Sequence, residues 1–275
     1  MSTRIKSAAV ALVIAIVVLI LHNTVVFNLA IGFITVMAVW EIFRATKYDR
    51  HQKVAIACYA FIGIDAVMPA AHYHGWMNFF NSNLYYLLFL LVVCVFYLID
   101  HKNFTYTDFF FMVGVTSLIN YCFSPLVAMA RVRGGVFFLV ITLCGAWLAD
   151  SGAYFAGTFL GKTPLCPEIS PKKTVEGLIG GVVSNGLIML IVSLVYTYIL
   201  KGFHVRFGWI FVAGMLCAVI GLIGDLTASI IKRQTGIKDY GNIMPGHGGV
   251  MDRFDSVLLV APFMFYLYTQ GLIFG

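Results

Sequence analysis

The strongest constraint on this chain is a succession of long apolar segments separated by short polar ones. Of its 275 residues, 61% are hydrophobic and only 11% are charged, whereas about a quarter of the residues of a soluble domain are charged. A helix needs roughly 20 apolar residues to cross the hydrocarbon layer of a bilayer, and runs of that length recur along the sequence. The sequence therefore predicts an all-α polytopic membrane protein.

We expect about nine transmembrane helices. The candidate segments cover residues 5–21, 24–43, 54–71, 83–99, 108–129, 135–160, 178–200, 207–231 and 254–274. The first segment has the basic start of a signal peptide but lacks a small-residue cleavage site, so we interpret it as an uncleaved helix. By role we divide the chain into residues 1–130, a scaffold of about five spans with a route for lipid, and residues 131–275, a catalytic region of about four spans.

The distribution of Lys and Arg predicts the orientation, because cytoplasmic loops carry the excess of these residues. With the N-terminus inside, 14 of the 18 Lys and Arg residues lie on the cytoplasmic side, and the exceptions are Arg131, Arg133, Lys201 and Arg206. This orientation places two polar loops, residues 161–177 and 232–253, on the same cytoplasmic face. The net charge of +6 does not indicate a nucleic-acid partner, because the basic residues are scattered among membrane loops.

Acidic residues near membrane depth need an explanation, because each costs about 2.5–3.5 kcal/mol on insertion scales. Asp225 comes about two turns before the cytoplasmic end of its span, and Asp252 and Asp255 are three residues apart, on one face of a helix. We interpret Asp65 as a packing or cavity residue. For Asp150, an active-site role and a packing role both stay open.

The polar loops combine carboxylates, cations and glycines. Carboxylates without Cys or His at ligand spacing suit a hard cation such as Mg²⁺, and Gly246, Gly248 and Gly249 would let backbone amides approach a phosphate. The cations of the same loops are Lys172, Lys173, Lys232, Arg233 and Lys238. Metal-bound carboxylates with fixed cations are what phosphoryl or nucleotidyl transfer requires. The glycines at 177, 180 and 181 indicate close helix packing instead.

A transporter with an acidic relay is the main alternative from a different class. It predicts acids near the bilayer centre and broken helices in paired halves. The acids here cluster toward one face and no halves repeat, which favours an enzyme.

The stretch of residues 229–255, "SIIKRQTGIKDYGNIMPGHGGVMDRFD", resembles the signature of the phosphatidate cytidylyltransferases, also called CDP-diacylglycerol synthases. Met244 stands where that signature has Leu, Ile or Phe. Residues 149–177 and 221–233 are similar to the family as well, whereas before Trp147 only hydropathy and span number agree. The signature positions that match are Ser229, Lys232, Arg233, Lys238, Asp239, Gly241, Pro245, His247, Gly248, Gly249, Asp252, Arg253 and Asp255.

The resemblance implies transfer of CMP from CTP to phosphatidic acid, giving CDP-diacylglycerol and pyrophosphate with Mg²⁺. It implies Mg²⁺ on Asp225 and Asp252, with Asp255 orienting Arg253 or holding a second cation. Ser170 and Ser229 would donate hydrogen bonds, and His247 would place a phosphate or protonate the pyrophosphate. The same residues give the predicted site: Asp225, Lys232, Arg233, His247, Asp252 and Asp255 as catalytic groups, and Ser170, Lys172, Lys173, Ser229, Lys238, Gly248, Gly249 and Arg253 as substrate-binding groups.

The expected partners are CTP, phosphatidic acid and the lipid bilayer, with the active site on the cytoplasmic side of a bacterial inner membrane. Small-residue faces permit a homodimer without requiring one. A CTP-dependent lipid kinase is the alternative within the same chemistry, because it too would handle CTP and a lipid phosphate. A CDP-alcohol phosphotransferase is excluded because its DGxxAR core is absent.

Overall fold

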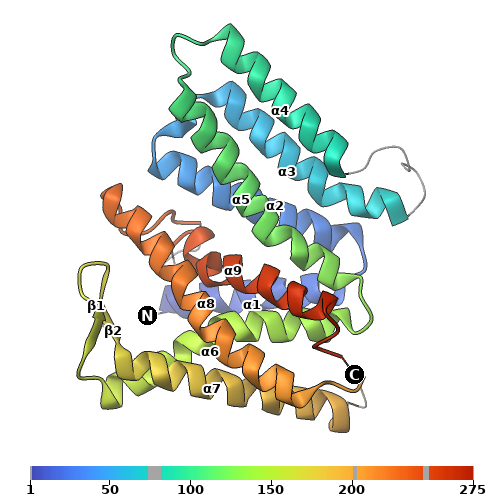
Figure 1. Ribbon diagram of the computed structural model, residues 1–275, viewed down its shortest axis with the longest axis vertical. Coiled ribbons are helices and arrows are strands. Elements are labelled where there is room, and N and C mark those ends of the chain that lie inside the picture. Colours follow the sequence, from blue (N-terminus) through green and yellow to red (C-terminus); the bar gives the residue numbers. More distant parts are fainter. Residues whose placement is uncertain (1, 74–81, 201–202, 244–247, 275) are drawn as a thin grey trace. The chain divides into compact units, whose positions relative to one another are not determined.

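The structure is a computed structural model that describes residues 2–73, 82–200, 203–243 and 248–274 (Figure 1). The chain forms two compact parts. The N-terminal part comprises residues 1–128 and 237–252, and the C-terminal part comprises residues 129–236 and 253–275. Each predicted span coincides with a helix among the described residues, so the all-α membrane class is confirmed. Five of these helices are long and apolar enough to cross a membrane, and the total number of spans stays a prediction.

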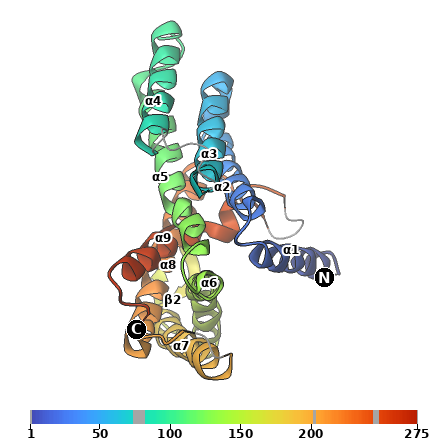
Figure 2. The ribbon, with the colours of Figure 1, turned by 90° about the vertical axis from the view of Figure 1, so that its right-hand side faces the viewer.

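The N-terminal part is a set of helices in which α3 (Gln52–Tyr73) packs beside both α2 (Val25–Ala45) and α4 (Ser82–Ile99), as Figure 1 shows. It also contains α1 (Ser2–Ile20), which leaves α2 at an angle (Figure 2), and α5 (Tyr106–Ala130), whose last two residues belong to the other part. Phe61 and Phe89 stack with ring centroids 4.5 Å apart between α3 and α4. Aromatic and aliphatic packing therefore holds these helices together.

Asp65 of α3 has the packing role that the sequence predicts. Its carboxylate accepts hydrogen bonds from the Tyr85 hydroxyl at 2.5 Å and from the Asn120 amide at 2.7 Å. It also lines a cavity of about 120 Å³ between helices of the N-terminal part. A carboxylate in apolar surroundings is tolerated when it is hydrogen-bonded in this way, and here the bonds join α3 to α4 and α5.

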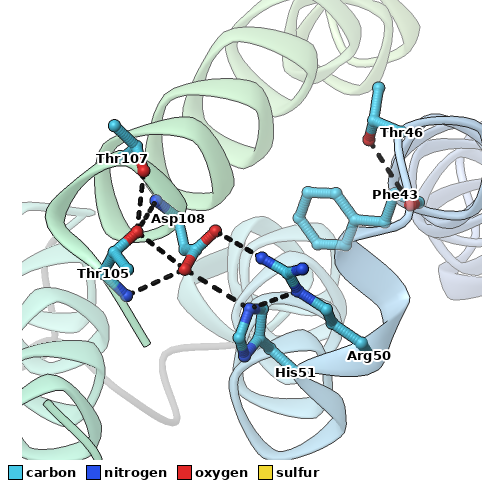
Figure 3. Close-up of polar contacts among 7 residues, drawn as sticks. All are labelled: Phe43, Thr46, Arg50, His51, Thr105, Thr107 and Asp108. Carbon is cyan, nitrogen blue, oxygen red and sulfur yellow. Dashed lines mark hydrogen bonds and ion pairs between the residues drawn. The ribbon is translucent and has the colours of Figure 1, made fainter. Parts of the chain in front are cut away.

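A polar network holds the start of α5 against the turn before α3 (Figure 3). Asp108 accepts hydrogen bonds from the backbone N–H and the hydroxyl of Thr105, both at 2.8 Å, which satisfies the free end of α5. Its other carboxylate oxygen accepts from the Arg50 guanidinium at 3.0 Å, and Arg50 Nε donates to His51 Nε2 at 2.9 Å. Arg50 ends a short 3₁₀ helix, Tyr48–Arg50. The network therefore connects segments almost 60 residues apart.

The C-terminal part is built on three closely packed helices: α6 (Gly135–Leu160), α7 (Val175–Leu194) and α8 (Phe207–Gln234). The buried Asn185 amide of α7 donates to Gly145 O of α6 at 2.9 Å and to Gly214 O of α8 at 2.8 Å. One π-helical turn, Val195–Ile199, extends α7, and α9 (Met251–Thr269) completes this part apart from its first two residues. A polar side chain shared by three helices fixes their register.

The predicted glycine packing is confirmed between α6 and α7. A Cβ atom on Gly180 would overlap the Cβ of Ala156, and one on Gly181 would lie 2.9 Å from Ala149 O. A Cβ atom on Gly177 would likewise lie only 2.8 Å from Ala153 O in the backbone of α6. The small residues therefore serve contacts within this chain, in the manner of small-residue faces in membrane helices.

The polar loop 161–177 contains regular structure that the sequence analysis did not predict. It holds an antiparallel hairpin of β1 (Pro164–Cys166) and β2 (Ser170–Thr174), and α7 starts at Val175 (Figure 1). Thr174 caps α7 by accepting a hydrogen bond from Gly177 N at 3.1 Å. Glu176 accepts from Lys162 N and Thr163 N at 3.1 and 3.2 Å, so both ends of the hairpin are fixed.

The first prediction concerns the pH dependence of stability. Burial lowers the pKa of His51 below its usual value near 6.5, although Asp108 opposes the shift. The unfolded chain then binds a proton that the folded chain resists, so this contribution to stability is complete above about pH 6.5 and is lost as the pH falls below it. Unfolding temperatures in detergent between pH 5 and 8 should therefore drop at the acid end. His51→Gln, which keeps an acceptor for Arg50 and cannot titrate, should show a smaller drop, and equal profiles would contradict this account.

The second prediction tests the contact between α6 and α7. Gly180→Ala should destabilise the protein by about 1–3 kcal/mol, because the new methyl group has no space beside Ala156. Gly114→Ala in α5 is the matched control, because a Cβ atom there meets nothing within 4 Å. Both substitutions raise the intrinsic helix propensity by the same amount, so the difference between them reports the steric contact. Thermal unfolding in detergent should separate the two variants, and equal stabilities would show that the helices are not in close contact at Gly180.

Candidate active site

The first group of predicted site residues gathers where the hairpin meets α8 in the C-terminal part. Lys173 of β2 forms an ion pair with Asp225 of α8, and both side chains are about three-quarters buried. Arg233, in the last turn of α8, donates from Nε to Ile169 O at 3.3 Å. The hairpin therefore contacts α8 at two points, through Lys173 and through Ile169 O. The second contact helps to fix the position of Lys173 in addition to its ion pair.

A cavity of about 650 Å³ lies among α6, the hairpin, α7 and α8. Four predicted site residues line it: Ser170, Lys172, Lys173 and Asp225. Most of its remaining wall is apolar and comes from helix faces such as those of Ala153, Leu178 and Leu222. A site with a few convergent polar groups on an apolar wall has the general character of a small-molecule site, and here it would accommodate an anion beside an apolar group.

Asp150 also lines this cavity, which favours the active-site alternative that the sequence left open. Its Oδ2 lies 3.5 Å from the Ser256 hydroxyl of α9, and it interacts electrostatically with Lys173 and Asp225. Thus α6 contributes a carboxylate to the same group as α8. The functional role of Asp150 itself stays a prediction.

Asp255 is the third carboxylate of this group. It is buried, accepts a hydrogen bond from Ser256 N at 2.7 Å, and interacts with Asp225 and with Lys232 of α8. Gly224 allows the approach, because a Cβ atom there would overlap Asp255 O. Like charges in such proximity repel, so the group is stabilised by a nearby cation. Lys173 and Lys232 supply positive charge on the protein side.

The second group of predicted residues lies in the N-terminal part. Asp252 Oδ2 accepts hydrogen bonds from Tyr240 N at 2.8 Å and Gly249 N at 2.9 Å. Gly248 has φ 87°, a left-handed conformation that favours glycine, and a Cβ there would lie 2.8 Å from Asp252 Oδ2. In this structure the N–H of Gly249 is directed at Asp252, so local chain geometry already requires these glycines. Their predicted role in phosphate binding is untested.

The remaining predicted residues are distributed over both parts. Ser229 and Lys232 lie on the C-terminal turns of α8, as the sequence predicts from their spacing to Asp225. Lys238 is exposed in the N-terminal part. Arg253, the third residue of α9, is exposed and belongs to the C-terminal part. The backbone of Arg253 accepts from Trp147 Nε1 at 3.0 Å. His247, together with Pro245 and Gly246, lies outside the described residues.

The donor chemistry of the site fits a hard cation. Asp150, Asp225 and Asp255 offer oxygen atoms only, which Mg²⁺ prefers. Within the described residues, no three or more His, Cys, Asp or Glu side chains are arranged as a complete metal site. Mg²⁺ is commonly bound through one or two carboxylates, with waters and substrate phosphates completing its shell. The residues present are compatible with that mode and not with a dedicated all-protein cage.

In the N-terminal part, Glu41 is a residue of the second group that the sequence does not single out. It is a fully buried acid in α2, and its carboxylate accepts from Val250 N at 2.9 Å and from Met251 N at 2.7 Å. The available signal was an ionisable residue inside an apolar span, which is rare and commonly functional.

The apolar helices define a helical membrane protein, and its cavity brings carboxylates and lysines together. The sequence comparisons specify the class further. The chain belongs to the cytidylyltransferase family, whose profile matches residues 2–270. The family that its signature predicted is thereby confirmed, and the chain is a nucleotidyltransferase.

Three bacterial relatives illustrate the similarity, and each is named phosphatidate cytidylyltransferase. The Bacillus subtilis (strain 168) protein is 37% identical over 182 residues, which cover 66% of each chain. The protein of Staphylococcus saprophyticus is 31% identical over 210 residues, 76% of this chain and 77% of the relative. The Haemophilus influenzae protein is 29% identical over 287 aligned positions, covering 96% and 97% of the two chains. The similarity therefore extends over both parts of the structure.

The third prediction compares two neighbouring lysines of the hairpin. Lys173→Met should lower transfer activity by roughly tenfold or more, because it removes a charge-assisted contact to Asp225 in the cavity. Lys172→Met should cost less, because that side chain is exposed and its charge is well solvated. The measurement is the initial rate of each purified variant, compared between variants that have the same unfolding temperature. Equal losses would show that the ion pair has no special importance.

Proposed function

We propose that this chain transfers CMP from CTP to phosphatidic acid, giving CDP-diacylglycerol and pyrophosphate in a Mg²⁺-dependent reaction. The observation that supports this most is the cavity that joins Lys173 and Asp225 to an apolar wall among α6, α7 and α8. A phospholipid has the matching chemistry, since its phosphate is anionic and its acyl chains are apolar. The names of the relatives supply the substrates for the proposal.

The proposed reaction needs little acid–base chemistry from the protein. An ionised phosphate oxygen of phosphatidic acid attacks the α-phosphorus of CTP and forms the new P–O bond. The bond from that phosphorus to the bridging oxygen of the β-phosphate breaks, and pyrophosphate leaves with the electron pair. The main barrier is bringing two polyanions together in line, which calls for positioning and for charge neutralisation.

The cations of the site would provide this neutralisation. Lys173 is held in place by Asp225, and Arg233 is held near the hairpin by its contact with Ile169 O. Cations that are already in position lose little entropy when the phosphate groups bind, so they stabilise the transition state more than mobile ones. Lys172, Lys232 and Lys238 would add positive charge, and Ser170 and Ser229 would donate hydrogen bonds.

We keep Asp225 and Asp252 as the proposed Mg²⁺ ligands. When bound, Mg²⁺ supplies further neutralisation of the phosphate oxygens. Asp225 has two carboxylates and one ammonium as neighbours, so a divalent cation bound there would offset the remaining negative charge. Asp252 has a second function in holding backbone N–H groups, so its substitution would disturb the loop as well. Asp255 would help to fix the position of Asp225 through its interactions with Asp225 and Lys232.

The proposed location is the cytoplasmic face of a bacterial inner membrane. The Lys and Arg distribution supports this orientation, and the apolar helices support membrane insertion. A phosphatidic acid headgroup lies at the bilayer surface while its acyl chains stay in lipid. An enzyme at that surface would need no extraction of the lipid.

The fourth prediction is a product analysis with CTP labelled separately on cytosine and on the γ-phosphate. Purified protein with phosphatidic acid and Mg²⁺ should place the cytosine label in a chloroform-soluble product and release the γ-label as pyrophosphate. Asp225→Asn should lower this rate by roughly a hundredfold or more, because charge stabilisation through a bound metal is worth several kcal/mol. Asp49→Asn, an exposed acid outside the site, is the matched control and should retain activity.

The other outcomes are equally informative. Lipid label from the γ-position alone would replace the proposal by a CTP-dependent lipid kinase. No lipid label in a folded preparation would reopen the transporter alternative. Near-normal rates in both Asp225→Asn and Asp252→Asn would exclude these two residues as the metal ligands while leaving the reaction in place.

A further inference from the structure

The N-terminal part contains a contact between α2 and the signature loop that none of the proposed chemistry uses. Glu41 is 0% exposed, in a helix that is otherwise almost entirely apolar. Its two carboxylate oxygens are divided between two consecutive backbone groups: Oε1 accepts from Val250 N at 2.9 Å, and Oε2 accepts from Met251 N at 2.7 Å. These bonds bridge more than 200 residues of sequence.

The position of these two N–H groups explains why the acid is tolerated there. Helix α9 begins at Met251, and the first N–H groups of a helix have no partner within the helix. The start of a helix also carries partial positive charge, which stabilises an adjacent carboxylate. Two charge-assisted hydrogen bonds then offset part of the cost of burying Glu41.

The glycines of the loop are shaped around the same carboxylate. A Cβ atom on Gly241 would lie 2.5 Å from Glu41 Oε1, and one on Gly249 would overlap both carboxylate oxygens. Both glycines belong to the signature, and from sequence we expect the backbone at Gly249 to approach a phosphate. The backbone passes so close to Glu41 on both sides that neither position has space for a side chain.

A second acid holds the loop from its other side. Asp252 Oδ2 accepts from Gly249 N and Tyr240 N, while Glu41 accepts from the next two N–H groups along the chain. Three consecutive backbone N–H groups, from Gly249 to Met251, are therefore fixed by two carboxylates. The orientation of Asp252 depends on this segment, because Asp252 directly follows Met251.

We infer that Glu41 is a positioning residue for the signature loop: it fixes residues 249–251 and through them the direction of the Asp252 carboxylate. Among the described residues, its hydrogen bonds go to the backbone N–H groups of Val250 and Met251. The inference rests on the proposed function, in which Asp252 is a Mg²⁺ ligand. Helix α2, which carries none of the motifs of the signature, would thereby take part in setting the metal affinity of the enzyme.

The test is the Mg²⁺ dependence of Glu41→Gln. Glutamine has nearly the same volume but only one acceptor oxygen, and its NH₂ group would face a backbone N–H donor. We expect kcat to fall, or the Mg²⁺ concentration for half-maximal activity to rise, by about 10–100-fold, the usual cost of losing a group that orients a metal ligand. The KM for CTP at saturating Mg²⁺ should change much less.

Thr35→Val is the matched control. Thr35 is equally buried in α2, and its hydroxyl donates only to Ile31 O of the same helix, at 2.8 Å. The substitution removes a buried polar group of α2 without touching the loop, so the Mg²⁺ dependence should stay that of the wild type. Unfolding temperatures of all variants in detergent report any general destabilisation.

Gly249→Ala changes the same contact from the side of the loop. It is the second test variant, for use if Glu41→Gln does not yield folded protein. Its methyl group should displace the Glu41 carboxylate and raise the Mg²⁺ requirement in the same direction. In a Glu41→Ala background the methyl group gains space, so the two losses should be less than additive. Unchanged Mg²⁺ dependence in both Glu41→Gln and Gly249→Ala, or loss of activity only in proportion to lost folded protein, would overturn the inference. Absence of labelled lipid with the wild-type protein would instead overturn the proposed function.

Discussion

An acid in an apolar chain must have partners, and this requirement shapes most of what is specific in the structure. A carboxylate placed in apolar surroundings without hydrogen bonds or a counter-charge is too costly to persist. Four of the acids accordingly meet donors from a distant segment: Glu41 meets the start of α9, Asp65 meets α4 and α5, Asp108 meets the turn before α3, and Asp225 meets the hairpin. Because apolar side chains pack with little directionality, these polar contacts determine which segments meet.

Close helix packing determines where the charged groups can then lie. Gly180 brings α7 against α6, which places the hairpin that precedes α7 beside the end of α8. Gly224 brings α8 against the start of α9, which places Asp225 beside Asp255. A larger residue at either position would separate the elements that carry the lysine and the carboxylates. Packing and charge are therefore coupled in the C-terminal part: the glycines create the proximity, and the cations make it tolerable.

The helices could be predicted from sequence because membrane spans are defined by length and apolarity alone, and both are local properties. The hairpin of residues 164–174 could not, because its strands are short and its sequence lacks the alternation of apolar and polar residues that marks a half-buried strand. The charged residues of the site could be predicted individually from the signature. Their partners could not, since the contact between Lys173 and Asp225 spans 52 positions and depends on how the helices pack.

Glu41 shows the same limit more sharply and changes how the N-terminal helices are understood. No signature motif lies before Trp147, which led us to expect only agreement in hydropathy there and a passive scaffold, whereas the family profile covers this region as well. In the structure, the middle of the signature, residues 237–252, belongs to the same compact part as residues 1–128. The carboxylate of Glu41 supplies part of the reason, because the loop's glycines and the first N–H groups of α9 are fitted to it. A loop that is mostly glycine and polar residues has little apolar surface with which to define its own conformation, so its geometry has to be imposed by a partner. An apolar helix with one correctly placed acid contributes to that task together with Asp252, and the family profile, which extends from residue 2 to residue 270, covers both parts.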